Sequence, residues 1–139
     1  MVILSVDYGD VRTGVAVCDK FEMLASPVGI VNEKYEPKLI ASLVEIINSK
    51  KLELIVVGLP KNMDGSLGFR AQACTEFAEH LTEACGIKTV MWDERLTTVS
   101  AYRALNEADF HGRKTRQVID AVAAITILQD YLARRKSMS

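Results

Sequence analysis

Four carboxylate residues of this chain lie in or beside strongly apolar sequence, where an uncompensated charge is costly. Asp7 ends the apolar run VILSVD, and Asp93 and Glu94 follow the run IKTVMW. Asp120 interrupts the apolar segment VIDAVAAITIL. Each also has an ordinary explanation as a turn residue, a strand-end polar residue or a partner of a helix dipole. Because ligands of open α/β sheets collect at the carboxyl ends of strands, Asp7 and the Asp93–Glu94 pair would meet if two central strands run the same way.

Such a carboxylate cluster predicts a bound cation. Carboxylates repel one another unless positive charge lies among them, which favours a hard divalent metal. An oxygen-only ligand set without nearby His or Cys favours Mg²⁺ or Mn²⁺ over zinc. Two such ions about 3.5 to 4 Å apart activate water and stabilise the leaving oxygen of a phosphodiester. The carboxylates therefore indicate one or two Mg²⁺ or Mn²⁺ ions and nuclease chemistry.

Basic residues and glycines near the carboxylates fit a phosphate backbone. Gly9 lets the chain come close to a ligand, Arg12 lies in the adjoining turn, and Arg95 follows the acidic pair. Other basic residues flank the loop LPKNMDGSLG or precede the last helix: Lys61, Arg70, Arg113, Lys114 and Arg116. Solvated surface charge explains them equally well. We expect these residues to bind nucleic acid, and Gly9, Gly58 and Gly65 to shape the surrounding loops.

The spacing of apolar residues predicts the elements that position these groups. Strands are expected at residues 2–7, 13–18, 22–31, 53–58 and 87–92. Helices are expected at residues 36–50, at 69–85 with Gly86 as the stop, from Thr97 or Thr98 to about 108, and from about 115 to 134. The first two strands form a hairpin, and Pro27 places the third at an edge or a bulge. The result is an α/β fold, a five-stranded mixed sheet with helices on both faces.

The whole chain has the composition of one ordinary domain over residues 1–139. Hydrophobic residues make up 49% and charged residues 25% of the sequence. No apolar stretch reaches the length of about 18 residues that a membrane span needs, and no signal peptide is evident, so we expect a cytoplasmic protein without membrane contact. The net charge of −1 gives no global basic signature, although the C-terminal part is locally basic.

The cysteines and histidines add no second chemistry. The three cysteines, Cys18, Cys74 and Cys85, lack the spacing of a zinc site or a disulfide framework, so we expect small buried apolar residues. His80 falls in the middle of an expected helix and is interpreted as a surface residue. His80 and His111 have no evident triad partners, so nothing supports Ser-His-Asp hydrolysis.

Four motifs in order resemble those of the YqgF/RuvX family of Holliday-junction-resolvase-like proteins, also regarded as pre-16S ribosomal RNA nucleases. They are DYGDVRTGVAV, VVGLPKNMDGS, DERLTT and DAVAAITILQDYL. The resemblance covers nearly the whole chain and implies a ribonuclease-H-like fold. It also implies a metal-dependent nuclease with Asp7, Glu94 and Asp120 as catalytic residues and Asp93 as a further candidate metal ligand. Related resolvases carry an acidic residue on the strand where this chain has VVGLP, so the DER segment must supply that carboxylate.

The resemblance favours trimming of the 5′ end of precursor 16S ribosomal RNA, with precursor RNA or pre-ribosomal particles as partners. Resolution of branched DNA in recombination or repair is the close rival, and it needs two active sites related by a two-fold axis. The sequence leaves monomer and homodimer open. Two other classes remain: an actin-like nucleotide-binding domain, against which the single-domain length argues, and a catalytically silent nucleic-acid or ribosome-binding module.

Overall fold

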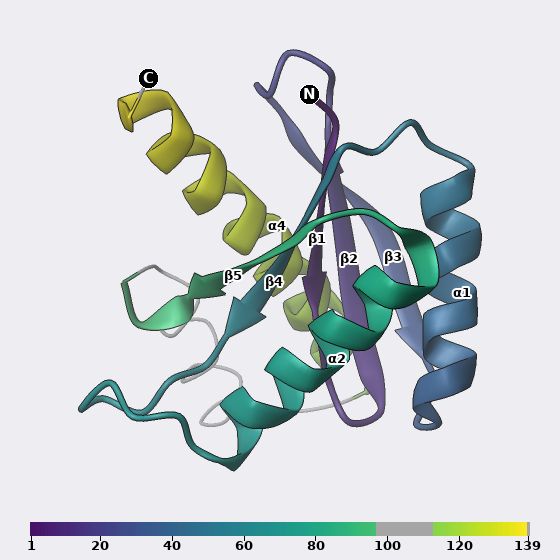
Figure 1. The fold of residues 1–139 in the computed structure, drawn as a ribbon, viewed down its shortest axis with the longest axis vertical. Coiled ribbons are helices and arrows are strands. Elements are labelled where there is room, and N and C mark those ends of the chain that lie inside the picture. The colour runs from purple at the N-terminus through teal and green to yellow at the C-terminus, as the bar shows by residue number, and fades with distance from the viewer. Residues whose placement is uncertain (97–112, 139) are drawn as a thin grey trace.

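A computed structural model describes residues 1–96 and 113–138 and shows a five-stranded sheet between two layers of helices (Figure 1). The strands are β1 (Ile3–Asp7), β2 (Arg12–Cys18), β3 (Ala25–Asn32), β4 (Leu54–Leu59) and β5 (Thr89–Asp93). The helices are α1 (Glu36–Asn48), α2 (Phe69–Cys85), α4 (Arg113–Met138) and the short 3₁₀ helix η1 (Glu94–Leu96). The predicted helix at 97–108 lies outside the described residues.

The sheet is mixed, as predicted, with the strand order β3-β2-β1-β4-β5. β1 pairs antiparallel with β2, and β2 pairs antiparallel with β3. β1 and β4 are parallel, as are β4 and β5, so these three strands point toward the same end of the sheet (Figure 1). Two antiparallel steps need only turns, whereas each parallel step needs a crossover, which α1 and α2 supply.

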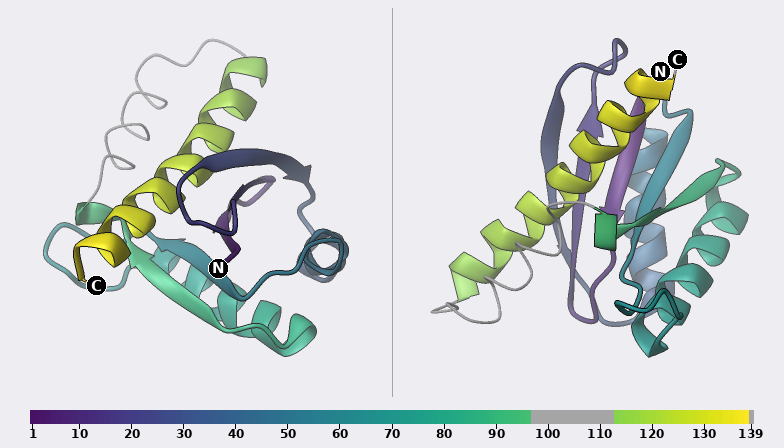
Figure 2. Two further views of the ribbon diagram at one scale, coloured as in Figure 1. Left: turned by 90° about the horizontal axis from the view of Figure 1, so that it is seen from above. Right: turned by 90° about the vertical axis from the view of Figure 1, so that its left-hand side faces the viewer.

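Both faces of the sheet are covered by helices (Figure 2). On one face α4 packs across β1, β2, β3 and β4. Buried residues of this side include Ile3, Val56, Ala124, Ile127 and Leu128. The other face is covered by α1 and α2, with Leu4, Val6, Leu43, Phe77 and Leu81 in its core. Successive residues of β1 therefore alternate between the two cores, as expected for a strand buried on both sides.

Local signals account for several element boundaries. α2 has the predicted bounds, and Gly86 ends it in a left-handed conformation with φ of 75°. β3 lies at the sheet edge, and its register with β2 shifts between Val15 and Ala16, beside Pro27, so both expectations for this proline are confirmed. α4 is longer than predicted at both ends.

The expectation of burial is confirmed for two of the three cysteines, and that of a surface position for His80. Cys18 and Cys74 are buried, Cys85 is half-buried, and all three are free thiols. The side chain of His80 is 53% exposed and faces Glu36 of α1, with Nδ1 2.6 Å from Oε1. The neighbouring carboxylate raises the pKa of His80 above its usual value. Within the part of the chain that the structure describes, no helix is both long and apolar enough to span a membrane.

Candidate active site at the carboxyl ends of β1, β4 and β5

Asp7 is the last residue of β1 and is nearly buried, at 5% exposed. Alternation along the strand places it on the same face as Ser5. The Ser5 hydroxyl donates a hydrogen bond of 2.6 Å to the carbonyl oxygen of Ala124 in α4. Asp7 therefore lies on the α4 face of the sheet, at the end where the parallel strands finish.

The turn that follows Asp7 depends on Gly9. A Cβ atom at this position would lie 2.0 Å from the carbonyl oxygen of Arg12, so any side chain would disrupt the turn. Arg12 is the first residue of β2, opposite Asn32 of β3, rather than a turn residue as predicted. The close approach that Gly9 allows is thus between two parts of the chain itself.

Glu94 occupies the space above Gly58. Its side chain is 2% exposed, and a Cβ atom on Gly58 would lie 2.7 Å from Glu94 Oε1 and 2.8 Å from Ile127 Cδ1. Gly58 pairs with Trp92 in the interior of the sheet, so it is a strand residue and its prediction as a loop glycine is wrong. The missing side chain serves packing: it makes room for a carboxylate between β4 and α4.

Asp7 and Glu94 therefore converge, although their strands are not adjacent. β5 is an edge strand rather than the second central strand that the sequence suggested, and β4 separates it from β1. Val6 pairs with Val57, so Asp7 comes level with Gly58. Because the Glu94 carboxylate lies over Gly58, it is about one strand spacing, roughly 5 Å, from β1. Two oxygens bound to one Mg²⁺ ion at about 2.0–2.1 Å lie no more than about 4 Å apart, a separation that side chains over neighbouring strands can reach.

Asp93 has a different environment from Glu94. Its carboxylate accepts hydrogen bonds from Arg95 at Nε, 3.1 Å, and Nη2, 2.8 Å. Lys61 Nζ lies 4.0 Å from Asp93 Oδ2. The Arg95 hydrogen bonds hold the pKa of Asp93 below its usual range. Arg95 and Lys61, both predicted to contact nucleic acid, are thus partners of Asp93 in this structure, whereas Glu94 faces Gly58.

Arg70 also has partners within the chain. Its guanidinium donates to Asp10 at 2.8 Å and to the carbonyl oxygen of Tyr8, and it lies 5.4 Å from the centroid of the Tyr8 ring. These contacts tie the start of α2 to the β1–β2 turn. In the loop before α2, Gly65 has φ of 91°, a conformation that favours glycine, and its Cβ position would lie 3.4 Å from Arg95 Nη1.

The remaining predicted site residues belong to the first turns of α4. Asp120 lies one turn before Ala124, the residue whose carbonyl accepts the Ser5 hydrogen bond. Because α4 begins at Arg113, the basic residues Arg113, Lys114 and Arg116 are part of the helix and do not precede it, as was predicted. Their side chains and that of Asp120 lie outside the described part of the structure, as does His111.

The described donors fit a hard cation. Asp7 and Glu94 offer only carboxylate oxygens, and Gly58 leaves open the space into which Glu94 reaches. Within the described residues no group of three or more His, Cys, Asp or Glu side chains is arranged around one point, and the side chain of Asp120 is not among them. Sequence reasoning found both carboxylates but missed the role of Gly58. Its signal was the glycine within the otherwise apolar strand LIVVGL, which indicates a close approach by another group.

Comparison with known proteins gives matches over nearly the whole chain. Residues 1–134 match the family model described as "RuvX: Holliday junction resolvase". The chain is 43% identical to a protein of Thermoanaerobacter pseudethanolicus, covering 99% of both chains, and 45% identical to one of Desulfitobacterium hafniense, covering 95% of this chain and 92% of that one. Both relatives are named "Putative pre-16S rRNA nuclease".

Solved structures with a similar fold include Holliday junction resolvases. Thermus thermophilus RuvC superimposes with a TM-score of 0.59 at 14% identity, covering 98% of this chain and 97% of that chain. The Fowlpox virus resolvase in complex with junction DNA has a TM-score of 0.56 at 13% identity, covering 96% of this chain and 98% of that one. These structures share the ribonuclease-H-like fold, which confirms the predicted fold class.

Proposed function

The chain belongs to the RuvX family, and from this premise we propose that it is a divalent-metal-dependent nuclease that processes the 5′ end of precursor 16S ribosomal RNA. Support for the activity comes from relatives at 43% and 45% identity that are named as pre-16S rRNA nucleases. Support for the chemistry comes from the two buried carboxylates. The substrate is then structured nucleic acid, and the bond hydrolysed is a phosphodiester.

The observation that carries the proposal is the convergence of Asp7 and Glu94 over Gly58. Two carboxylates at 5% and 2% exposure are costly to bury together unless positive charge compensates them. Asp7 and Glu94 would hold Mg²⁺ or Mn²⁺, one ion or two, with Asp120 from α4 as the third acidic residue. The chemistry that a bound divalent ion supplies is activation of water and stabilisation of the leaving oxygen.

The protein's own residues fix the geometry for that chemistry. Asp7 is held by its pairing with Gly14 of β2, and the preceding residue, Val6, pairs with Val57 of β4. Glu94 Oε1 and Ile127 Cδ1 both lie over Gly58 of β4. The Ser5 hydrogen bond ties α4 to β1 one turn beyond Asp120, which sets the distance between the two elements. Side chains held in fixed positions are what precise positioning of a scissile phosphate requires.

A cleavage panel tests this proposal. Wild-type protein is incubated with an RNA spanning the 5′ end of 16S ribosomal RNA and its precursor sequence, and with four-way DNA junctions, in Mg²⁺, in Mn²⁺ and in EDTA. We expect cleavage of the RNA at the mature 5′ end, with either metal and not with EDTA. Cleavage that persists in EDTA contradicts the metal mechanism. Absence of cleavage on every substrate contradicts the enzyme assignment and favours a silent binding module.

The family model's description supports a second candidate, resolution of Holliday junctions. Symmetric cutting of opposed strands needs two copies of the site related by a two-fold axis. Sedimentation of the protein alone and with a four-way junction distinguishes the two functions. A stable dimer that cuts junctions in preference to precursor RNA would favour the resolvase, whereas a monomer that cuts only RNA supports ribosomal RNA processing.

A further inference from the structure

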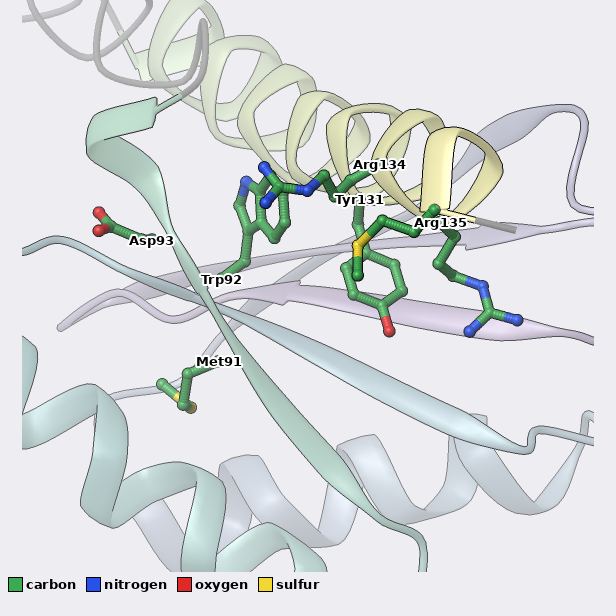
Figure 3. A pocket seen from close by; sticks show the side chains of 7 residues that line it. Met91, Trp92, Asp93, Tyr131, Arg134 and Arg135 are labelled. Carbon is green, nitrogen blue, oxygen red and sulfur yellow. The ribbon is translucent and has the colours of Figure 1, made fainter.

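A pocket of about 640 Å³ lies between β5 and the C-terminal half of α4 (Figure 3). β5 contributes Met91, Trp92 and Asp93 to its walls, and α4 contributes Tyr131, Arg134 and Arg135. Asp93, which lines the pocket, directly precedes Glu94 of the candidate active site. Its volume falls within the range of about 300–1,000 Å³ that is typical of ligand pockets.

Two half-buried aromatic rings give the pocket walls that suit a planar ligand. The ring centroids of Trp92 and Tyr131 lie 5.8 Å apart with an angle of 88° between the ring planes. Figure 3 shows the side chains of Trp92 and Tyr131 reaching into the same space from opposite elements. The Nε1 atom of Trp92 is buried and has no hydrogen-bond partner within the described residues. A ligand that displaces the atoms covering Nε1 would therefore accept a hydrogen bond from it.

The charge of the pocket is positive once its internal ion pairs are counted. Asp93 is paired with Arg95 at 2.8 Å, and Arg135 is paired with Glu22 at 2.8 Å. The exposed guanidinium of Arg134 makes no ion pair within residues 1–96 and 122–138, and it extends toward Trp92 across the pocket (Figure 3). One uncompensated arginine beside two aromatic rings is the combination that recognises a phosphate and a base together.

We propose that this pocket binds an unpaired nucleotide of the strand that enters the candidate site, with the base against Trp92 and Tyr131 and a phosphate at Arg134. An unpaired nucleotide fits because a base within a duplex already has both faces stacked, whereas an unstacked base can use an aromatic ring. Asp93, one of the lining residues, directly precedes Glu94, so a strand that reaches the candidate site would pass near the pocket. The inference rests on the proposed function, because it concerns the path of that substrate.

Intrinsic fluorescence gives a direct test, since Trp92 is the sole tryptophan of the chain. A short fluorescein-labelled oligouridylate is titrated into the full-length protein in EDTA, so that no cleavage intervenes. Binding is followed by the anisotropy of the label, and unlabelled oligouridylate is used to follow the emission of Trp92. We expect the two curves to give the same dissociation constant and the oligouridylate–oligoadenylate duplex to bind with a smaller change in Trp92 emission.

Matched variants test the contributions of the arginine and of the aromatic ring separately. Arg134→Gln is expected to weaken oligouridylate binding several-fold. It should also reduce the slope of log binding constant against log salt concentration by about one. Lys38→Gln, which removes the same charge from exposed Lys38 of α1 on the other face of the sheet, should have no such effect. Tyr131→Leu should weaken binding about tenfold, while Tyr131→Phe, which keeps the ring, should not.

Several results would contradict the proposed binding of a nucleotide in this pocket. Anisotropy that rises while Trp92 emission stays constant places the strand elsewhere. If Lys38→Gln and Arg134→Gln weaken oligouridylate binding equally, the overall charge of the protein determines the affinity and the pocket does not. Trp92 emission that changes with protein concentration alone shows that a second copy of the chain fills the pocket. Since these measurements exclude metal and cleavage, a failure here leaves the nuclease assignment to be decided by the cleavage panel.

Discussion

At the scale of single residues, the absence of a side chain on Gly58 is as informative as the carboxylates. A glycine in a central strand weakens the sheet, so its presence calls for a close approach by another group. Here that group is Glu94, whose Oε1 lies 2.7 Å from the position of a Cβ atom, next to Ile127 Cδ1 at 2.8 Å. Gly58 is therefore a positioning residue: it acts on the site through Glu94.

Gly58→Ala should lower both stability and activity, since the new methyl group collides with two side chains. Overpacking of this kind costs about 1–3 kcal/mol of unfolding free energy. The double variant Gly58→Ala/Ile127→Val removes the Cδ1 contact but keeps the collision with Glu94. We expect urea denaturation to show partial recovery of stability in the double variant and cleavage assays to show no recovery of rate. Equal recovery of both would mean that Glu94 has no part in the reaction.

At the scale of elements, α4 brings distant parts of the chain together. Its middle contacts β1 through Ser5, and its C-terminal half is tied to the β2–β3 connection through Arg135 and Glu22, Nε to Oε1 2.8 Å apart. The α-amino group of Met1 also donates to Glu22, at 2.9 Å. The same helix carries Asp120 toward its start, so the contacts of its far end help to fix the direction of the helix that bears Asp120.

The Glu22 cluster predicts a specific pH dependence of stability. Two hydrogen bonds hold the pKa of Glu22 below its usual value. The larger effect comes from Arg135, and the next from the α-amino group of Met1. A carboxylate with a depressed folded-state pKa contributes stability above the unfolded-state pKa, about 4.3 for Glu. That stability is lost as the pH falls through the folded-state pKa.

Glu22→Gln should therefore remove about 1 kcal/mol at neutral pH and flatten the acid side of the stability curve. Urea denaturation of wild type and variant across the acid range measures this difference. Glu79→Gln, which changes an exposed carboxylate of α2, serves as the control and should leave the curve close to that of wild type. If the unfolding free energies of Glu22→Gln and wild type change in parallel with pH, protonation of Glu22 is not linked to folding.

At the scale of the whole molecule, much of the fold follows from the sequence because its signals are local. Apolar runs bounded by Gly and Pro located the strands, and Gly86 marked the end of α2 at the correct residue. Pro27 correctly indicated an edge strand with a register shift. The prediction that both faces carry helices followed from strands that are almost continuously apolar, such as β1 and β4, whose residues are all buried.

What the sequence left open depends on contacts between distant elements. Strand order is one example, because nothing in IKTVMW reveals that β5 lies at the edge beyond β4. The choice between Asp93 and Glu94 is another, since adjacent carboxylates look alike until Arg95 and Gly58 define their surroundings. Likewise, the interpretation of Arg70 as a nucleic-acid contact did not anticipate its partners Asp10 and Tyr8.

The most direct test compares the adjacent carboxylates in one assay: cleavage rates of Glu94→Gln and Asp93→Asn on the precursor RNA in Mg²⁺, beside wild type and Asp7→Asn. Each variant removes one charge and keeps nearly the same shape. We expect Glu94→Gln and Asp7→Asn to lose at least about 100-fold in rate, because even residues that only orient metal ligands cost about 10–100-fold. Asp93→Asn should retain most of its activity. Full activity in Glu94→Gln together with loss in Asp93→Asn would contradict the assignment.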